Sequence, residues 1–481
     1  MNYSVVIYIL GWIMEIEAAF LALPGIVSAI YGEKGGFAFL WVALGSAVAG
    51  SAIILRKPKN MRFYLREGFV TVALSWILMS VIGCLPFVIN GDIPHFADAL
   101  FEMISGFTTT GATVVSDVEG LTKGSLFWRS FSHWIGGMGV LVFLLAIVPM
   151  AGSHMNLMKA ESPGPSVGKL VPKVRQTAKY LYIIYFTLTM IEVIFLLFGG
   201  MNLFEALTTS FGTAGTGGFA IWNDGFVSVS PYNQWVVTIF MLLFGVNFGF
   251  YFLILTGKLR DALKFEEVRI YFIIVIAAAV FIFINLRHFA LYAPAEGIRQ
   301  AFFQVASIIT TTGFASADFN LWPETSRTIL VLLMFIGACA GSTGGGIKVS
   351  RFIIACKSFI KEIISYLHPR SVKKIKIEGK PLEHETLRAT NVYFMTYMVI
   401  FAVSVLLVSI ENKDLVTNFA AVAATFNNIG PGLSLVGPMA NFGHFTDFTK
   451  YILMFDMLAG RLEIFPMMLL FCPAVWKRRR A

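Results

Sequence analysis

The sequence predicts an all-α integral membrane protein with four internal repeats and two additional N-terminal transmembrane helices. Of its 481 residues, 57% are hydrophobic and only 14% are charged, whereas a soluble globular chain is roughly 45–50% apolar and about 25% charged. Apolar stretches of about 20 residues, enough to cross a bilayer, follow one another along the chain. A glycine-containing motif recurs four times at similar spacing. The composition excludes an ordinary cytoplasmic enzyme and an intrinsically disordered protein.

The apolar stretches divide into long and short ones. Candidate spans cover roughly residues 5–30, 37–55, 69–89, 127–149, 180–199, 234–256, 270–290, 328–347, 350–367, 391–410 and 448–475. Four shorter apolar segments lie near 96–108, 203–214, 298–310 and 415–427. Each has about twelve residues, which is too few to cross a bilayer as a helix.

The basic residues predict the orientation of these spans. The chain has 37 Lys and Arg against 28 Asp and Glu, a net charge of +9. Five segments hold 28 of the 37 basic residues, namely 56–66, 159–179, 258–269, 348–388 and the tail 477–480. These segments alternate with loops that hold few basic residues, and basic loops are typical of the cytoplasmic side. We therefore expect both termini in the cytoplasm and the four short segments on the outer side. The excess charge then reflects topology and does not indicate nucleic-acid binding.

The four short segments end in similar motifs. These are Thr109-Thr110-Gly111, Gly215-Thr216-Gly217, Thr311-Thr312-Gly313 and Asn428-Ile429-Gly430, whose last glycines are 106, 96 and 117 residues apart. A single copy would read as a helix end with a glycine cap, but four copies on one side favour a repeated unit of span, short helix, loop and span. The predicted units are 1–60 (a two-helix domain), 67–150, 175–258, 268–368 (with a broken second helix) and 388–481.

A short helix that stops halfway through the membrane directs its carbonyl end, with partial negative charge, towards the membrane centre. The irregular backbone that follows must be buried in protein or line water. Glycine permits a positive φ there and lets carbonyl groups approach an axis. Four such loops around one axis would form a ring of carbonyl oxygens, which is how a pore replaces the hydration shell of K⁺.

These motifs resemble the Trk/Ktr/HKT superfamily of potassium transport proteins, most closely the bacterial TrkH-type subunit. The resemblance covers essentially the whole chain, and the two leading spans favour the TrkH type over the shorter KtrB type. It implies a pseudo-fourfold pore whose filter glycines are Gly111, Gly217, Gly313 and Gly430, and glycine at all four positions favours K⁺ over Na⁺. The fourth loop departs from the Thr-Gly pattern. The implied K⁺ ligands are Thr110, Gly111, Thr216, Gly217, Thr312, Gly313, Ile429 and Gly430.

A second glycine-rich segment interrupts the outgoing span of the third repeat. It contains Gly337, Gly341, Gly344, Gly345 and Gly346 and is followed by Lys348. Five glycines cannot form a comfortable helix, at about 1 kcal/mol each relative to alanine. By resemblance to the family, 337–346 is predicted to be an intramembrane gating loop. The alternative is a close-packing surface of small residues. Lys348 either adds positive charge to the gate or is the first cytoplasmic anchor.

One basic residue, Arg461, lies inside the span 448–475, together with Asp456 and Glu463. A charge within the membrane is costly and indicates function. In the family an arginine of the last span lies near the pore below the filter, and Arg461 matches it. We expect Arg461 to raise the barrier to cations when the gate is closed. The alternative is a structural ion pair with Glu463 or Asp456.

The predicted function is that of a K⁺-selective, ion-conducting subunit of a potassium uptake system, with K⁺ as cargo and no cofactor bound by the chain itself. We find no enzyme site. The alternative is a secondary transporter for an organic solute with inverted repeats, which the common side of the four short segments opposes. The resemblance implies a cytosolic, nucleotide-binding regulatory partner of the RCK type (TrkA-like), a homodimer, and the bacterial inner membrane as location.

Overall fold

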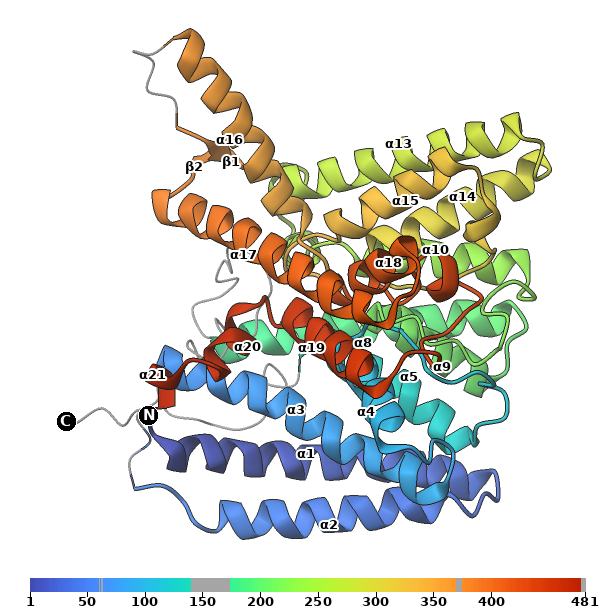
Figure 1. The fold of residues 1–481 in the computed structure, drawn as a ribbon, viewed down its shortest axis with the longest axis vertical. Coiled ribbons are helices and arrows are strands. Elements are labelled where there is room, and N and C mark those ends of the chain that lie inside the picture. Colours follow the sequence, from blue (N-terminus) through green and yellow to red (C-terminus); the bar gives the residue numbers. More distant parts are fainter. Residues whose placement is uncertain (60, 62–63, 140–173, 369–373, 477–481) are drawn as a thin grey trace.

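A computed structural model describes residues 1–59, 61, 64–139, 174–368 and 374–476. The described part is almost entirely helical (Figure 1), apart from a two-stranded antiparallel hairpin, β1 (Lys376–Ile377) and β2 (Lys380–Pro381). The predicted all-α membrane architecture is confirmed. The end of the expected span 127–149 and most of the basic segment 159–179 lie outside the described residues.

Six helices in the described part are long and apolar enough to cross a membrane. They are α1 (Tyr3–Ile30), α2 (Gly36–Ile54), α3 (Leu65–Asn90), α8 (Val174–Phe198), α13 (Glu266–His288) and α17 (His384–Val408), the last extended by η2 (Ser409–Glu411). The hydroxyl of Tyr3 donates to the carbonyl of Trp476, so the first and last helices meet at one end of the bundle (Figure 1). The predicted spans at these positions agree with the helices to within seven residues at each end.

Four short helices lie among the long ones (Figure 1): α4 (Phe96–Phe107), α9 (Leu203–Gly215), α14 (Pro294–Ile309) and α18 (Leu415–Phe426). At 1.5 Å per residue they are about 18–24 Å long, shorter than the roughly 30 Å hydrocarbon core. Side-chain caps fix where two of them begin, because Asn202 accepts from the backbone of Glu205 and Asp414 from that of Thr417. Their C-terminal halves are buried: those of α4, α14 and α18 lie mainly in one large hydrophobic core, and that of α9 lies partly in this core and partly in a second one.

The helices that follow the short ones are α5 (Lys123–Met138), α10 (Pro231–Phe244) with α11 (Phe248–Leu255), α15 (Glu324–Ile336), and α19 (Asp447–Arg461) with α20 (Phe465–Leu470) and α21 (Pro473–Trp476). The last three of these are interrupted within the described residues, whereas the chain that follows α5 lies outside them from residue 140 on. The continuous spans predicted at 234–256 and 448–475 are therefore wrong. Between α10 and α11 the chain bends by 89°, and Asn247 caps the new helix by accepting from Gly249. After α19, Ile464 has a φ of 68°, and Pro466 lies in the first turn of α20, which begins at Phe465.

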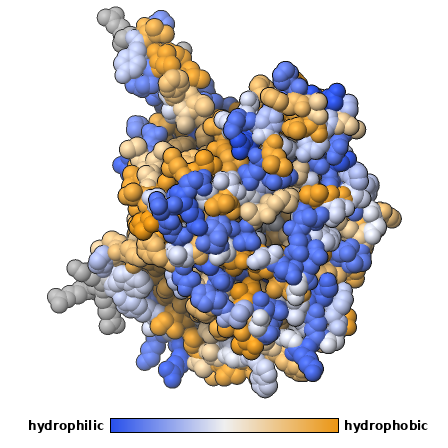
Figure 2. All heavy atoms as spheres, turned by 45° about the vertical axis from the view of Figure 1, so that its right-hand side comes forward, coloured by the Kyte–Doolittle hydropathy of each residue, from blue (hydrophilic) through white to orange (hydrophobic). Residues whose placement is uncertain are grey.

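Helix α16 (Val349–Leu367) differs from the span predicted at 350–367 because it is amphipathic rather than uniformly apolar. It projects from the bundle beside the hairpin (Figure 1), and Figure 2 shows it at the upper left with hydrophobic side chains along one side. Phe359, Ile360 and Ile363 are exposed there. The remaining short elements are α12 (Leu259–Ala262), η1 (Phe319–Leu321) and η3 (Ser434–Val436).

Candidate functional site

The four short helices end in the same backbone conformation. The first or second residue after each helix has a left-handed φ of 55° to 59°, namely Thr109, Thr216, Thr311 and Asn428. The amide of the next residue donates to the carbonyl five residues earlier, at 2.8–2.9 Å, in the pairs Thr110–Ser105, Gly217–Gly212, Thr312–Ser307 and Ile429–Ala424. This hydrogen bond, together with the left-handed residue before it, is the Schellman motif that ends many helices. It fixes which residues of the four loops correspond.

The correspondence shifts the second loop by one residue. Glycines with φ between 78° and 96° follow at Gly111, Gly218, Gly313 and Gly430. The sequence comparison of the loops had aligned Gly217 with the other three, but its backbone position corresponds to Thr110, Thr312 and Ile429. Both residues are glycine, so the sequence alone did not distinguish them. Gly218 is therefore the functional candidate that sequence reasoning missed.

The four loops meet head to tail. A Cβ atom added to Gly111 would lie 2.0 Å from the carbonyl oxygen of Gly217 in the second loop. The same contact recurs from Gly218 to Thr312 at 2.0 Å, from Gly313 to Ile429 at 1.9 Å, and from Gly430 back to Thr110 at 2.7 Å. No side chain fits at any of the four positions. Each glycine thus packs against the carbonyl before the next loop's glycine, and the contacts close into a ring.

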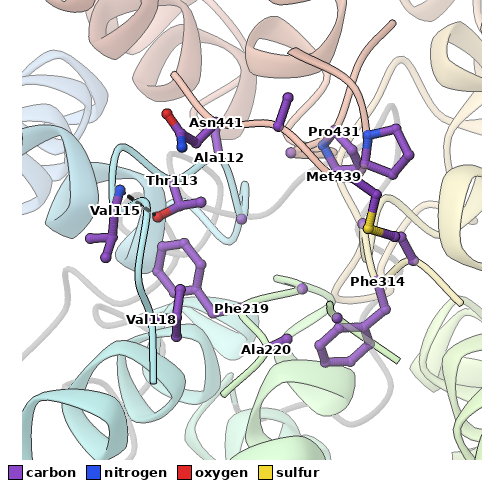
Figure 3. Close-up of a pocket in the computed structure, with 18 of the residues that line it drawn as sticks. Ala112, Thr113, Val115, Val118, Phe219, Ala220, Phe314, Pro431, Met439 and Asn441 are labelled. Carbon is purple, nitrogen blue, oxygen red and sulfur yellow. Dashed lines mark hydrogen bonds between the residues drawn. The ribbon is translucent and has the colours of Figure 1, made fainter. Parts of the chain in front are cut away.

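A cavity of about 130 Å³ opens on the side of the ring where the chain continues. The residues after the four glycines line it, and Figure 3 shows the four loops approaching it from four sides with Ala112, Phe219, Phe314 and Pro431. This volume accommodates several water molecules. Three acids that follow the loops, Asp117, Asp224 and Asp318, accept hydrogen bonds from nearby turn or cap groups and do not line the cavity.

A buried ion pair supports the first loop from behind. Arg129 of α5 lies 2.7 Å from Glu102 of α4, with side chains 2% and 0% exposed. Glu102 also accepts from the hydroxyl of Thr113 and the amide of Val114, at 2.9 and 3.1 Å. The guanidinium of Arg129 lies 4.2 Å from the ring centre of Phe219 in the second loop. The sequence signal for this pair is Glu102 itself, because an acid in the middle of a short apolar helix indicates a buried partner.

We expect Glu102→Gln to destabilise the folded protein, because Arg129 would remain buried without its counter-charge. Removing one partner of a buried pair typically costs about 3–5 kcal/mol. Thermal unfolding of the detergent-solubilised protein should show a clearly lower midpoint. The matched control is Glu324→Gln, which removes the carboxylate that faces Arg327 with a side chain 82% exposed. Equal midpoints for the two variants would show that the buried pair is not required for stability.

The glycine-rich segment 337–348 lies against the ends of the third and fourth loops. The amide of Gly345 donates to the hydroxyl of Thr311 at 2.6 Å, and a Cβ on Gly345 would lie 2.6 Å from the carbonyl oxygen of Asn427. Gly337, Gly341 and Gly346 have φ between 70° and 74°. Lys348 is 1% exposed and donates to the carbonyl of Gly344. Its side chain therefore folds back under the segment, unlike an anchor in solvent.

Two neighbouring helices hold this segment. One carboxylate oxygen of Glu267, in the first turn of α13, accepts from the amides of Ala340 and Ser350 at 2.7 and 3.0 Å. The segment also pairs with the break between α10 and α11, because Cys339 donates to Gly245 at 3.1 Å. The interruptions in the second and third repeats therefore form one packed unit.

Arg461, at the end of α19, connects this segment to the first repeat. One guanidinium nitrogen donates to the carbonyl of Thr343 at 2.7 Å. Another donates to the carbonyls of Gly136 and Gly137 at the end of α5, at 2.5 and 3.0 Å. The two acids suggested as alternative partners contact other groups. Glu463 forms an ion pair with Arg351, and Asp456 accepts from Ser404 at 2.7 Å.

The structure thus brings the predicted filter and gate residues into one column. Starting from the cavity, the ring of glycines and carbonyls comes next, then Thr311 and Asn427 against Gly345, and then Arg461. The column contains carbonyl oxygens, hydroxyl groups and one guanidinium. Within the described residues, no group of three or more His, Cys, Asp or Glu side chains could hold a metal ion.

Comparisons with known proteins agree with this geometry. The family model TrkH, described as a cation transport protein, matches residues 37–478. The chain is 36% identical to the Trk system potassium uptake protein TrkH of Escherichia coli K12, over 99% of this chain and 100% of that protein. It is 35% identical to the TrkH protein of Vibrio parahaemolyticus, with the same coverage. The crystal structure of the potassium transporter TrkH from Vibrio parahaemolyticus superimposes with a TM-score of 0.89 at 32% identity, covering 99% of this chain and 100% of that one.

Proposed function

This chain belongs to the TrkH family of cation transport proteins, and we propose that it is the K⁺-conducting transmembrane subunit of a Trk-type potassium uptake system. The closed contact between each loop glycine and the next loop's carbonyl carries the proposal. Carbonyl oxygens held in such a ring replace the water around a K⁺ ion. The relatives named as potassium uptake proteins support the choice of ion.

We assign the selectivity filter to the four loops, with Gly218 in place of Gly217 as the ring glycine of the second. Four helix ends point their carbonyl dipoles at this region, and each contributes partial negative charge. The four short helices therefore favour a cation at the ring without any carboxylate in it. A dehydrated ion would bind the backbone carbonyls of Thr110, Gly217, Thr312 and Ile429, the residues whose oxygens face the neighbouring glycines.

The gate in this proposal is the segment 337–348 together with Arg461. Three facts support it: the segment packs directly against the filter loops, its glycines permit rearrangement, and a guanidinium holds it from the inner side. A positive charge below a cation filter opposes the passage of K⁺. Conduction then requires Arg461 and the segment to move together.

We also propose the assembly that the family relationship suggests. The chain would lie in the bacterial inner membrane with both termini cytoplasmic, form a homodimer, and bind a cytosolic nucleotide-binding subunit of the RCK type. The supporting feature is the concentration of basic residues in the segments 258–269 and 348–388, which we expect on the inner side. A basic surface of this kind attracts acidic protein or anionic lipid.

The proposed function is tested by ion uptake into proteoliposomes that contain the purified protein. We expect uptake of ⁸⁶Rb⁺ that unlabelled K⁺ and Rb⁺ abolish at much lower concentrations than Na⁺ or Li⁺ do. Gly111→Ser should admit more Na⁺, because a side chain at this position displaces the carbonyl of Gly217. Equal competition by all four cations would contradict the K⁺ filter. Empty liposomes are the control for leakage.

A further inference from the structure

His133, on the outgoing helix of the first repeat, lies between two elements of the filter. Its Nδ1 lies 2.7 Å from the carbonyl oxygen of Gly106, near the end of the first short helix. Its Nε2 accepts from the amide of Phe219, immediately after Gly218 in the second loop, at 3.2 Å. The side chain is fully buried. One imidazole therefore joins the first short helix to the second loop.

The chemistry of its two partners fixes the protonation of His133. A carbonyl oxygen can only accept and a backbone amide can only donate, so the proton must be on Nδ1 and the lone pair on Nε2. The ring centre also lies 4.3 Å from that of Phe219. This neutral tautomer satisfies both ring nitrogens within the protein.

The side chain and the backbone of His133 account for two glycines of the second loop. A Cβ on Gly217 would lie 2.2 Å from Cγ of His133, and one on Gly215 would lie 2.2 Å from its carbonyl oxygen. Loops one and three have threonine at the position of Gly217. The second loop must have glycine there because His133 occupies the space of that side chain.

The fourth repeat has no histidine at the position that corresponds to His133. A Cβ atom added to Gly136 on α5 would lie 1.9 Å from the carbonyl oxygen of Phe107. One added to Gly460 on α19 would lie 2.0 Å from the carbonyl oxygen of Phe426. These matching contacts align His133 with Met457, which is also buried. A methionine thioether cannot donate a hydrogen bond, so the fourth repeat lacks the link through two hydrogen bonds that His133 makes in the first.

We propose that His133 is a positioning residue that holds the second filter loop in register and so contributes to the discrimination of K⁺ from Na⁺. The inference rests on the proposed filter function. The carbonyl of Gly217 faces Gly111 in the ring, and the imidazole lies on the other side of the same residue. Displacing the imidazole therefore displaces one of the four carbonyls that surround the ion.

The test compares two substitutions in the proteoliposome assay. His133→Phe keeps a ring but removes both hydrogen bonds, and we expect the ratio of Na⁺ to K⁺ concentrations needed for half-inhibition of ⁸⁶Rb⁺ uptake to fall by about tenfold. His133→Gln retains one donor and one acceptor, and we expect its ratio to stay within about threefold of the unaltered protein. The matched control is His288→Phe, the same change at an exposed histidine.

A normal ratio in a folded His133→Phe protein, or the same loss in His133→Gln, would overturn the inference. Should His133→Phe fail to fold, His133→Met replaces it, because the corresponding position in the fourth repeat already holds a buried methionine. Thermal unfolding of each variant separates loss of fold from loss of selectivity. Failure of the unaltered protein to prefer K⁺ would instead contradict the proposed function, so the two failures are distinguishable.

Discussion

Replacing Gly313 by alanine is expected to reduce K⁺ uptake by about tenfold to a hundredfold. The added methyl group would lie 1.9 Å from the carbonyl oxygen of Ile429, and the residue has a φ of 83°. A non-glycine residue in such a strained conformation costs about 1–3 kcal/mol, and the displaced carbonyl adds to this cost. The expected loss follows from tenfold per 1.36 kcal/mol in a rate. Growth of a potassium-uptake-deficient host at low K⁺ and ⁸⁶Rb⁺ uptake both measure it.

The control for this variant is Gly45→Ala in α2, where an added Cβ has no neighbour within 4 Å. It should leave uptake unchanged, because alanine also favours the helix. Gly218→Ala tests the corrected alignment of the loops, since its methyl group would lie 2.0 Å from the carbonyl oxygen of Thr312. Normal uptake by both Gly313→Ala and Gly218→Ala would contradict the ring.

Replacing Arg461 by glutamine is expected to raise basal cation flux severalfold in the absence of any regulatory subunit. Glutamine can still donate to a carbonyl, but it removes the positive charge below the ring. The measurement is ⁸⁶Rb⁺ flux through purified protein in liposomes, normalised to the amount of protein incorporated. The control is Arg287→Gln. It removes an exposed arginine in the last turn of α13 that donates to the carbonyl of Tyr292.

Arg461→Lys separates charge from structure. Lysine keeps the charge but cannot reach Thr343 and the end of α5 at the same time, because an ammonium group is a single point and the guanidinium is a planar fork. If charge is the barrier, the lysine variant should stay closed while the glutamine variant conducts. If instead the hydrogen bonds from Arg461 to both Thr343 and the end of α5 hold the gate closed, both variants should conduct. Unchanged flux in both would leave Arg461 without a role in gating.

The long helices could be predicted because their signal is local. Hydropathy alone locates α1, α2, α3, α8, α13 and α17 to within seven residues at each end, since each must be apolar over its own length. The interruptions were harder, because the groups that satisfy the broken backbone come from elsewhere in the chain. Cys339 donates to Gly245, and neither residue predicts the other. Asn247 and Pro466 were local signals, since a cap and a proline inside an apolar run indicate new helix starts.

The candidate site could likewise be predicted where its signal is local, but not where it depends on contacts between distant parts of the chain. The repeated loops located the region, and the family relationship inferred from them is confirmed by the comparisons. The alignment of the second loop was not predictable, because Gly217 and Gly218 are adjacent and only their φ values tell them apart. The hydrogen-bond partners of Arg461 could not be predicted from the sequence either. The charges within one span left a local ion pair of Arg461 as the alternative, but Glu463 pairs with Arg351, which lies 112 positions away in the chain.

A ring closed by one polypeptide has a genetic consequence. In a pore made of four identical chains, every codon change alters four places at once, and a tolerable adjustment must suit all of them. Here a single substitution reaches one quadrant. The second loop, in which Gly217 packs against His133, differs in sequence from the first and third loops although the ring of contacts stays closed. Mutational scanning should accordingly find different tolerated residues at the four equivalent positions, with the spectrum at each set by its own neighbours.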